Sequence, residues 1–314
     1  MGSQPTSSSS QQRLYFLDTD LSSPHPRRGR ILSSNTDGSD LRPIIDHLPT
    51  LPDGIAVDAA AGHMYWTNMG TSLKTASGSI ERANLHDGSD RTVIVPASSA
   101  VGVHTPKQIT LAPRTRKLYW CDREGMKVMR ANLDGSDVEV LVSTGDANND
   151  AHRADPMRWC VGVAVDEARG FVYWTQKGPS KGNQGRILRA PLDLPQGAFP
   201  AQRWDVEVVF RDLPEPIDLE LDDESQTLYW TDRGDPPAGN SLNRAAVGMG
   251  GMPQVLATRL HETIGLALDR DADLVYVTDL AGGVYKVDVK TRKKTVLFAE
   301  VGDVTGIALV QGVE

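Results

Sequence analysis

Two acidic side chains, Asp218 and Glu220, combine residue type and spacing in a way that suggests chemistry. If their segment is a β-strand, residues two apart project from the same face of that strand. Carboxylates withdrawn from water need partners or acquire raised pKa values, and either state suits an acid, a base or a hydrogen-bonding group at the floor of a pocket. A structural alternative stays open, in which Glu220 pairs with an arginine or with backbone amides.

Most of the further candidates lie in long segments without a strand pattern. Trp159 and Met157 could form an apolar wall for a flat or hydrophobic ligand. Three cations could bind an anionic or enolic oxygen, although they could equally form a solvated rim. They are Arg123, Lys177 and Arg233. Proton transfer could come from His104, His152 or His261, and Gln108 could contribute a hydrogen bond to a substrate.

Motifs for metal or nucleotide chemistry are missing from the sequence. There is no His-x-His, His-Glu-x-x-His or Cys-x-x-Cys and no phosphate-binding loop. Cys121 and Cys160 are expected to be buried free thiols. We therefore expect no metal and no cofactor, and chemistry that rests on positioning, exclusion of water and proton transfer.

The composition narrows the range of partners. The 314 residues include 33 Lys and Arg against 41 Asp and Glu, a net charge of −8, which argues against nucleic acid and favours a small-molecule substrate. No apolar run approaches the ~20 residues that a membrane span needs. Residues 1–12 lack the basic and apolar stretches of a signal peptide and are Ser-rich, so we expect a disordered tail and a cytoplasmic protein.

A repeat of aromatic residues organises the rest of the chain. Six tyrosines, five of them followed or preceded by a second aromatic residue, lie 50, 54, 54, 56 and 47 residues apart, and such a period indicates a propeller or a solenoid. The six are Tyr15, Tyr65, Tyr119, Tyr173, Tyr229 and Tyr276. Alternating patterns and Asp-Gly turns within each unit predict four short antiparallel strands.

The ends of the sequence predict how the units close. The chain opens on a second strand, residues 13–18, and ends on a segment, residues 304–309, with the pattern of a first strand. Pairing the two completes the sixth unit. The fold class is therefore all-β, one six-bladed β-propeller of four-stranded antiparallel blades over residues 13–314.

The inner strands also point to a site. Their first and third residues are Gly or Ala in four blades, whereas one blade carries Gln108 and Thr110 and another Asp218 and Glu220. The connections on one face of the ring are longer than strand pairing requires, so we expect function on that face, over the central funnel.

The motifs resemble a known family. Tyr65-Trp66-Thr67-Asn68 and its counterparts resemble the YWTD repeats, also called class B repeats, of low-density lipoprotein receptors, with mild departures at Phe16, Cys121, Gln176 and Val277. The resemblance covers residues 13–309 and implies a six-bladed propeller. The receptor propellers are extracellular protein binders flanked by cysteine-rich modules, which this sequence lacks.

Fold, size and the missing export signal are also similar to fungal enzymes of tropolone sesquiterpenoid assembly. That resemblance implies a hetero-Diels–Alder cycloaddition between a quinone methide and a terpene alkene. Two alternatives remain: a non-catalytic protein-interaction propeller, and a metal-dependent lactonase-like hydrolase in which Asp218, Glu220 and Asn68 would be the ligands.

Overall fold

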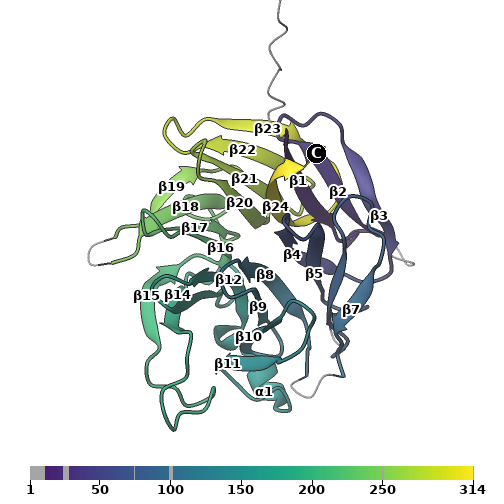
Figure 1. Cartoon of the computed structure of the whole chain (residues 1–314). Helices are drawn as coiled ribbons and strands as arrows, with labels where there is room; N and C mark the ends of the chain where they lie inside the picture. The colour runs from purple at the N-terminus through teal and green to yellow at the C-terminus, as the bar shows by residue number, and fades with distance from the viewer. Residues whose placement is uncertain (1–10, 24–27, 74, 99–101, 249–250, 314) are drawn as a thin grey trace, which may run out of the picture.

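Six four-stranded antiparallel sheets stand around a central axis like the blades of a propeller (Figure 1). The computed structural model describes residues 11–23, 28–73, 75–98, 102–248 and 251–313. Within these residues one short helix, α1 (Asp150–Arg153), and one 3-10 turn, η1 (Pro156–Arg158), interrupt the strands. The predicted fold class is confirmed.

Each blade contributes four strands in order from the axis outward. The inner strands are β4 (Pro52–Asp58), β8 (Pro106–Ala112), β12 (Cys160–Asp166), β16 (Pro216–Asp222), β20 (Thr263–Asp269) and β24 (Val304–Val313). The second strands are β1 (Gln11–Asp18), β5 (His63–Asn68), β9 (Lys117–Asp122), β13 (Phe171–Gln176), β17 (Thr227–Asp232) and β21 (Leu274–Asp279). The third strands are β2 (Gly29–Asn35), β6 (Ser79–Asn84), β10 (Lys127–Asn132), β14 (Gly185–Pro191), β18 (Ser241–Ala246) and β22 (Val284–Asp288). The outer strands are β3 (Arg42–Leu48), β7 (Thr92–Val95), β11 (Glu139–Ser143), β15 (Glu207–Leu213), β19 (Gln254–Ala257) and β23 (Lys294–Phe298).

The last strand of the chain completes the first blade. β24 pairs antiparallel with β1 from Arg13↔Val310 to Asp18↔Val304, with a register shift between Phe16 and Asp18, in the sheet order β24-β1-β2-β3. This is the closure that the sequence predicts. β1 begins at Gln11, two residues before the predicted start, and the rest of the predicted tail, residues 1–10, lies outside the described residues.

The aromatic pairs join neighbouring blades. Each repeat tryptophan is at most 1% exposed and packs in the apolar cluster that holds the tyrosine of the preceding blade. Trp120 packs with Tyr65, and Trp174 packs with Tyr119. The period of the aromatic residues thus reflects one packing contact repeated around the ring.

The threonine of the repeat links the inner strands of adjacent blades. Thr175 Oγ1 accepts the N–H of Gly162 in its own blade at 2.7 Å and donates to the carbonyl oxygen of Ile217 in the next blade at 2.7 Å. Thr67 and Thr231 make the equivalent pair of bonds. The inner strands approach so closely that a Cβ on Gly162 would lie 2.3 Å from the Ile217 oxygen, which explains the small residues there.

Candidate functional site

Four cations meet at the axis on the face of the long connections. Lys107 lies in the inner strand β8, whereas the other three follow the second strands β9, β13 and β17 directly. Because successive blades repeat the same register, their side chains reach the axis at one level. We call this group, Lys107, Arg123, Lys177 and Arg233, the cation cluster; it lines a cavity of about 30 Å3.

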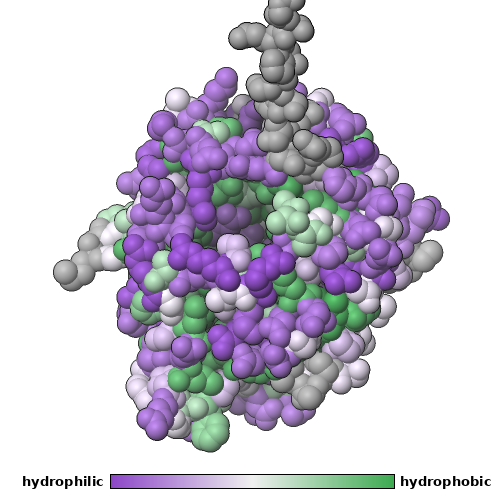
Figure 2. All heavy atoms as spheres, viewed as in Figure 1, coloured by the Kyte–Doolittle hydropathy of each residue, from purple (hydrophilic) through white to green (hydrophobic). Residues whose placement is uncertain are grey.

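The floor of this cavity is apolar. Val161, Ile217 and Ile264 occupy the second position of three inner strands and are buried together. The volume suffices for one oxygen-bearing group. The larger part of any ligand would lie above the cluster, on the face of the long connections, whereas the hollow at the centre of the ring in Figure 2 lies on the opposite face.

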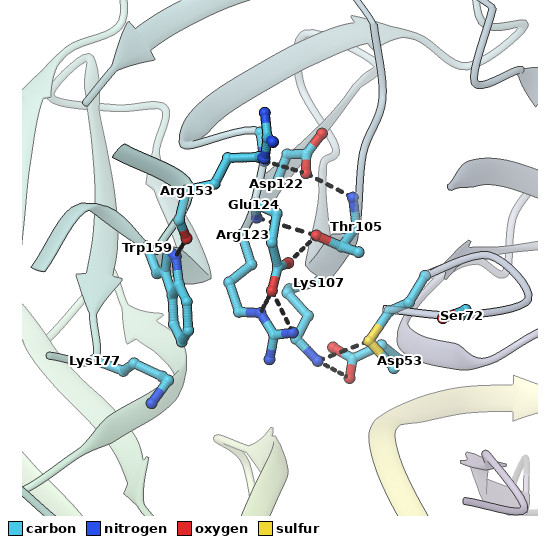
Figure 3. A network of polar contacts seen from close by, with 12 residues as sticks. Asp53, Ser72, Thr105, Lys107, Asp122, Arg123, Glu124, Arg153, Trp159 and Lys177 are labelled. Atoms are coloured by element: carbon cyan, nitrogen blue, oxygen red, sulfur yellow. Dashed lines mark hydrogen bonds and ion pairs between the residues drawn. The ribbon is translucent and has the colours of Figure 1, made fainter. Parts of the chain in front are cut away.

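Each cation of the cluster pairs with a carboxylate. Glu215 is fully buried and lies 2.7 Å from Lys177 Nζ and 2.9 Å from Arg233 Nη2. Arg123 Nε donates to Glu124 at 2.7 Å, and Lys107 Nζ lies 2.7 Å from Asp53 (Figure 3). Of these carboxylates only Asp53 lines the cavity, so the cavity presents mainly positively charged donors.

Burial shifts the pKa values of the two lysines in the cation cluster. It lowers the pKa of Lys177, although the hydrogen bond to Glu215 opposes the shift. Burial likewise lowers the pKa of Lys107 against the charge of Asp53. For Glu215 burial acts to raise the pKa, but Arg233 and Lys177 outweigh it and the pKa is lowered. Each cation is thus held by a charged partner in a largely desolvated setting.

Trp159 covers part of the cation cluster. Its ring centre lies 5.1 Å from the Arg123 guanidinium and 5.3 Å from Lys177 Nζ, distances at which a cation is attracted to an aromatic face (Figure 3). The indole N–H donates to the carbonyl oxygen of Arg153 in α1 at 2.8 Å, which fixes the ring. Trp159, Arg123, Lys177 and Arg233, four of the predicted site residues, therefore come together.

The remaining candidates lie elsewhere. Met157 lines an outer pocket with Arg186 and Val208 rather than the wall beside Trp159. None of the three histidines lines the small cavity. His152 Nδ1 accepts the N–H of Asp146, and the backbone N–H of His104 donates to Asp122. The backbone N–H of His261 donates to Asp279 in the same way.

Asp218 and Glu220 line a second cavity on the axis. It measures about 400 Å3 and is bounded by Arg270 and Asp271, directly after β20, and by Gln311 near the end of β24, on the face opposite the long connections. Both side chains accept backbone N–H groups of β20, Asp218 from Leu266 at 3.0 Å and Glu220 from Leu268 at 3.3 Å. These bonds match the structural alternative that the sequence left open.

Burial raises the pKa of both carboxyl groups. The pKa of Glu220 rises to about 7, and that of Asp218 rises well above its ordinary value. Gln108 lies between the two cavities. Its side chain lines the larger cavity, and its Nε2 donates at 3.1 Å to Oδ2 of Asp53, which lines the small cavity.

Sequence reasoning missed Lys107, Asp53 and Glu215. A signal for the first two was present. Both residues directly precede the inner-strand position that is Gly in four blades, so they are in register with Val161, Ile217 and Ile264. Comparing that one position across the six repeats would have found them. Glu215 lies in a connection outside the repeat register, so no such comparison reaches it.

Another buried carboxyl group makes stability depend on pH. Asp232 ends β17, accepts the N–H groups of Glu215 and Gly234, and has a pKa that burial raises to about 7. Between the unfolded value of about 3.9 and that value the folded state holds more protons than the unfolded state. The free energy of unfolding should therefore fall as pH rises from 5 to 7, by up to about 1.4 kcal/mol per pH unit for this group.

Urea unfolding at pH 5, 6 and 7 measures that slope. Asp232→Asn keeps an oxygen for the two N–H groups and removes the titration, so the slope should become shallower. An unchanged slope in this variant would assign the pH dependence to other groups.

Among the described residues no group of three His, Cys, Asp or Glu side chains is placed to hold a metal ion. None of the helices in the described part of the chain is long and apolar enough to cross a membrane.

Fold and site together define a six-bladed β-propeller with an axial pocket, and comparisons with known proteins identify its relatives. No protein-family model matches the chain. A Pyricularia oryzae protein named low-density lipoprotein receptor-related protein 1 is 62% identical over 320 residues, which cover 99% of this chain and all of that protein. The chain therefore belongs to this family of low-density lipoprotein receptor-related propellers.

Other similarities are more distant. The 3-hydroxyacyl-CoA dehydrogenase-like protein LAM1 of Cochliobolus heterostrophus is 39% identical over 96% of this chain, which spans 65% of the length of that relative. A propeller in the crystal structure of the nidogen/laminin complex superposes with a TM-score of 0.72 at 21% identity, over 96% of this chain and 99% of that one. At that identity the similarity shows the fold alone.

Proposed function

We propose that this protein is a small-molecule enzyme that binds an anionic or enolic oxygen at the cation cluster. The reaction proposed is the hetero-Diels–Alder cycloaddition of a tropolone-derived quinone methide with a terpene alkene. The observation that supports it is the convergence of Lys107, Arg123, Lys177 and Arg233 on one small cavity with an apolar floor.

The chemistry suits such a site. The cycloaddition forms one C–O and one C–C bond, rearranges π electrons, and needs neither a covalent partner nor a redox equivalent. Donors aimed at the quinone methide oxygen withdraw electron density from the diene and stabilise the negative charge that grows on that oxygen in the transition state. Because the donors are held by Glu124, Glu215 and Asp53, little reorganisation is needed.

Substitution of two cluster cations tests the role of these donors. Lys177→Met and Arg123→Met should each lower the rate of adduct formation about 10²–10³-fold, the usual cost of losing one preorganised donor. Lys181→Met is the matched control, since its ammonium lies on the same connection and pairs with Asp235, a side chain that is 62% exposed. The assay supplies a hydroxymethyl tropolone as quinone methide precursor and a macrocyclic terpene, and measures adduct against the spontaneous background.

The outcomes separate the candidates. Equal rates in wild type, Lys177→Met and Lys181→Met, with intact folding, would remove the cation cluster from the mechanism. No adduct above background from the wild-type protein would favour the non-catalytic alternative. That alternative is supported by Phe199 and Trp204, which are 68% and 69% exposed on the β14–β15 connection.

Neither other activity gains comparable support. The described residues offer no three-residue ligand set for a metal-dependent hydrolase. The dehydrogenase-like name belongs to a relative with a third of its length beyond the match, and the described strands form antiparallel blades rather than the parallel sheet of a dinucleotide-binding fold. We therefore do not extend that name to this chain.

A further inference from the structure

The larger axial cavity is separate from the cation cluster. About 400 Å3 in volume, it adjoins a groove of about 320 Å3 with which it shares Thr110, Leu111, Leu219, Glu220 and Arg270. The mouth lies among the turns that follow the inner strands, on the face opposite the long connections. The proposed cycloaddition leaves this space without a role.

The larger cavity and the adjoining groove together form a channel, and polar side chains line part of it. β12 lies between β8 and β16 and carries Gly162 and Ala164 at its third and fifth positions. The neighbouring strands carry Gln108 and Thr110 on one side and Asp218 and Glu220 on the other. Of β12, Val163 lines the larger cavity and Ala164 and Val165 line the groove, so this strand presents apolar side chains between the polar side chains of its two neighbours.

Groups that remain open toward this space are hydrogen-bond acceptors. Asp218 uses its two oxygens for the N–H groups of Leu219 and Leu266, whereas Glu220 uses only Oε2, for Leu268. Gln108 Nε2 donates to the carbonyl oxygen and to Oδ2 of Asp53. Within the described residues the amide oxygen of Gln108, which is only 3% exposed, and the second oxygen of Glu220 have no donor. A ligand here must supply donors.

The charge of the walls indicates the sign of that ligand. Five acidic residues line the two spaces against two basic ones, Arg114 and Arg270. The acids are Asp218, Glu220, Asp223, Asp271 and Glu167. Arg270 is already engaged, since its Nη2 donates to the carbonyl oxygen of Leu221 at 2.6 Å and its Nη1 lies 3.4 Å from Asp223. The excess of acids favours a cation.

We propose that the channel is a second ligand site, for a protonated aliphatic amine whose ammonium group lies between Gln108, Thr110 and Glu220. An ammonium has three donors and matches the acceptors on the two neighbouring strands, while the alkyl chain runs toward the mouth along the apolar side chains of β12. The site is independent of the proposed cycloaddition, because it uses other residues on the other face.

Binding should depend on pH through Glu220. The charged and titratable groups that line the two spaces with Glu220 are Asp218, Asp223, Asp271, Glu167, Arg114 and Arg270. Burial raises the pKa of Glu220 to about 7, and Arg270 opposes the shift. An ammonium favours the carboxylate, so binding below that pH must expel a proton. Affinity should therefore rise from pH 6 to pH 8, by at most about tenfold per pH unit below the pKa.

Isothermal titration of the full-length protein with 1,4-diaminobutane tests the site. The wild-type protein should bind one equivalent, more tightly at pH 8 than at pH 6, and should not bind 1,4-butanediol. Glu220→Gln keeps an oxygen for the Leu268 N–H and should weaken diamine binding at least about tenfold. Asp235→Asn, which neutralises an exposed acid on the opposite face, should leave it unchanged.

Three results would overturn the proposal. They are no diamine binding by the wild-type protein, equal binding by Glu220→Gln, and stoichiometric Ca²⁺ binding that excludes the diamine, which would assign the channel to a metal ion. Thr110→Val serves as a second variant if Glu220→Gln fails to fold. None of these titrations measures cycloaddition, so failure of the channel site and failure of the proposed function are distinguishable.

Discussion

Glu215→Gln is expected to lower the free energy of unfolding by about 3–5 kcal/mol, the usual cost of removing one partner from a buried ion pair. The Glu215 side chain is 0% exposed and lies within 2.9 Å of both Lys177 Nζ and Arg233 Nη2. It also accepts the backbone N–H of Lys181 at 3.0 Å. Glutamine retains the shape but leaves the buried Lys177 and the partly buried Arg233 without their shared charge. Urea unfolding at pH 7 measures the loss.

A matched variant separates burial from charge. Glu262→Gln removes another carboxylate from Arg233, at 3.1 Å, but Glu262 is 44% exposed. Exposed ion pairs contribute about 0–1 kcal/mol, so this change should have a small effect. If both variants lose equally little stability, the cation cluster does not depend on its buried partner. In that case the preorganisation on which the proposed catalysis rests would be absent as well.

Deleting residues 304–314 is expected to abolish cooperative folding. β24 supplies the inner strand of the first blade and carries the buried side chains of Val304, Ile307 and Val310. Without it, Leu14 and Phe16 on β1, both 0% exposed, lose the strand that covers them, and the ring opens at an unpaired edge. Circular dichroism with thermal melting should show no cooperative transition.

A shorter deletion is the control. A chain ending at Val310 keeps the register from Arg13↔Val310 to Asp18↔Val304 and should melt close to the full-length protein. A synthetic peptide of residues 304–314 added to the long deletion should restore part of the cooperative transition. A long deletion that melts like the full-length chain would show that the propeller does not require its closing strand.

The architecture was accessible from the sequence because its signals are local and repeated. The Tyr-Trp pair, the alternation within each strand and the Asp-Gly turns recur about every fifty residues, so errors in one unit are corrected by the others. Closure followed from matching an unpaired second strand with an unpaired inner strand. The bonds of Thr175 to Gly162 and Ile217 add the reason why threonine belongs to the motif.

The candidate site was accessible in part. Arg123, Lys177 and Arg233 hold the same place after successive second strands, so their convergence could be inferred from register. Trp159 joins them only because its connection folds back through α1 and η1 and the Arg153 carbonyl fixes the indole. Met157, two residues earlier, faces a different pocket, and spacing alone could not distinguish the two.

The sequence by itself determined the blades, their number and their closure, since strand pairing and aromatic packing act between segments of fixed spacing. Tertiary structure alone decided which side chains share a cavity. Asp218 and Glu220 do project from one side of β16, yet they line a channel that lies apart from the cation cluster, with Asp53 and Gln108 hydrogen-bonded between them. That separation depends on how closely six strands approach the axis, a distance that no single repeat encodes.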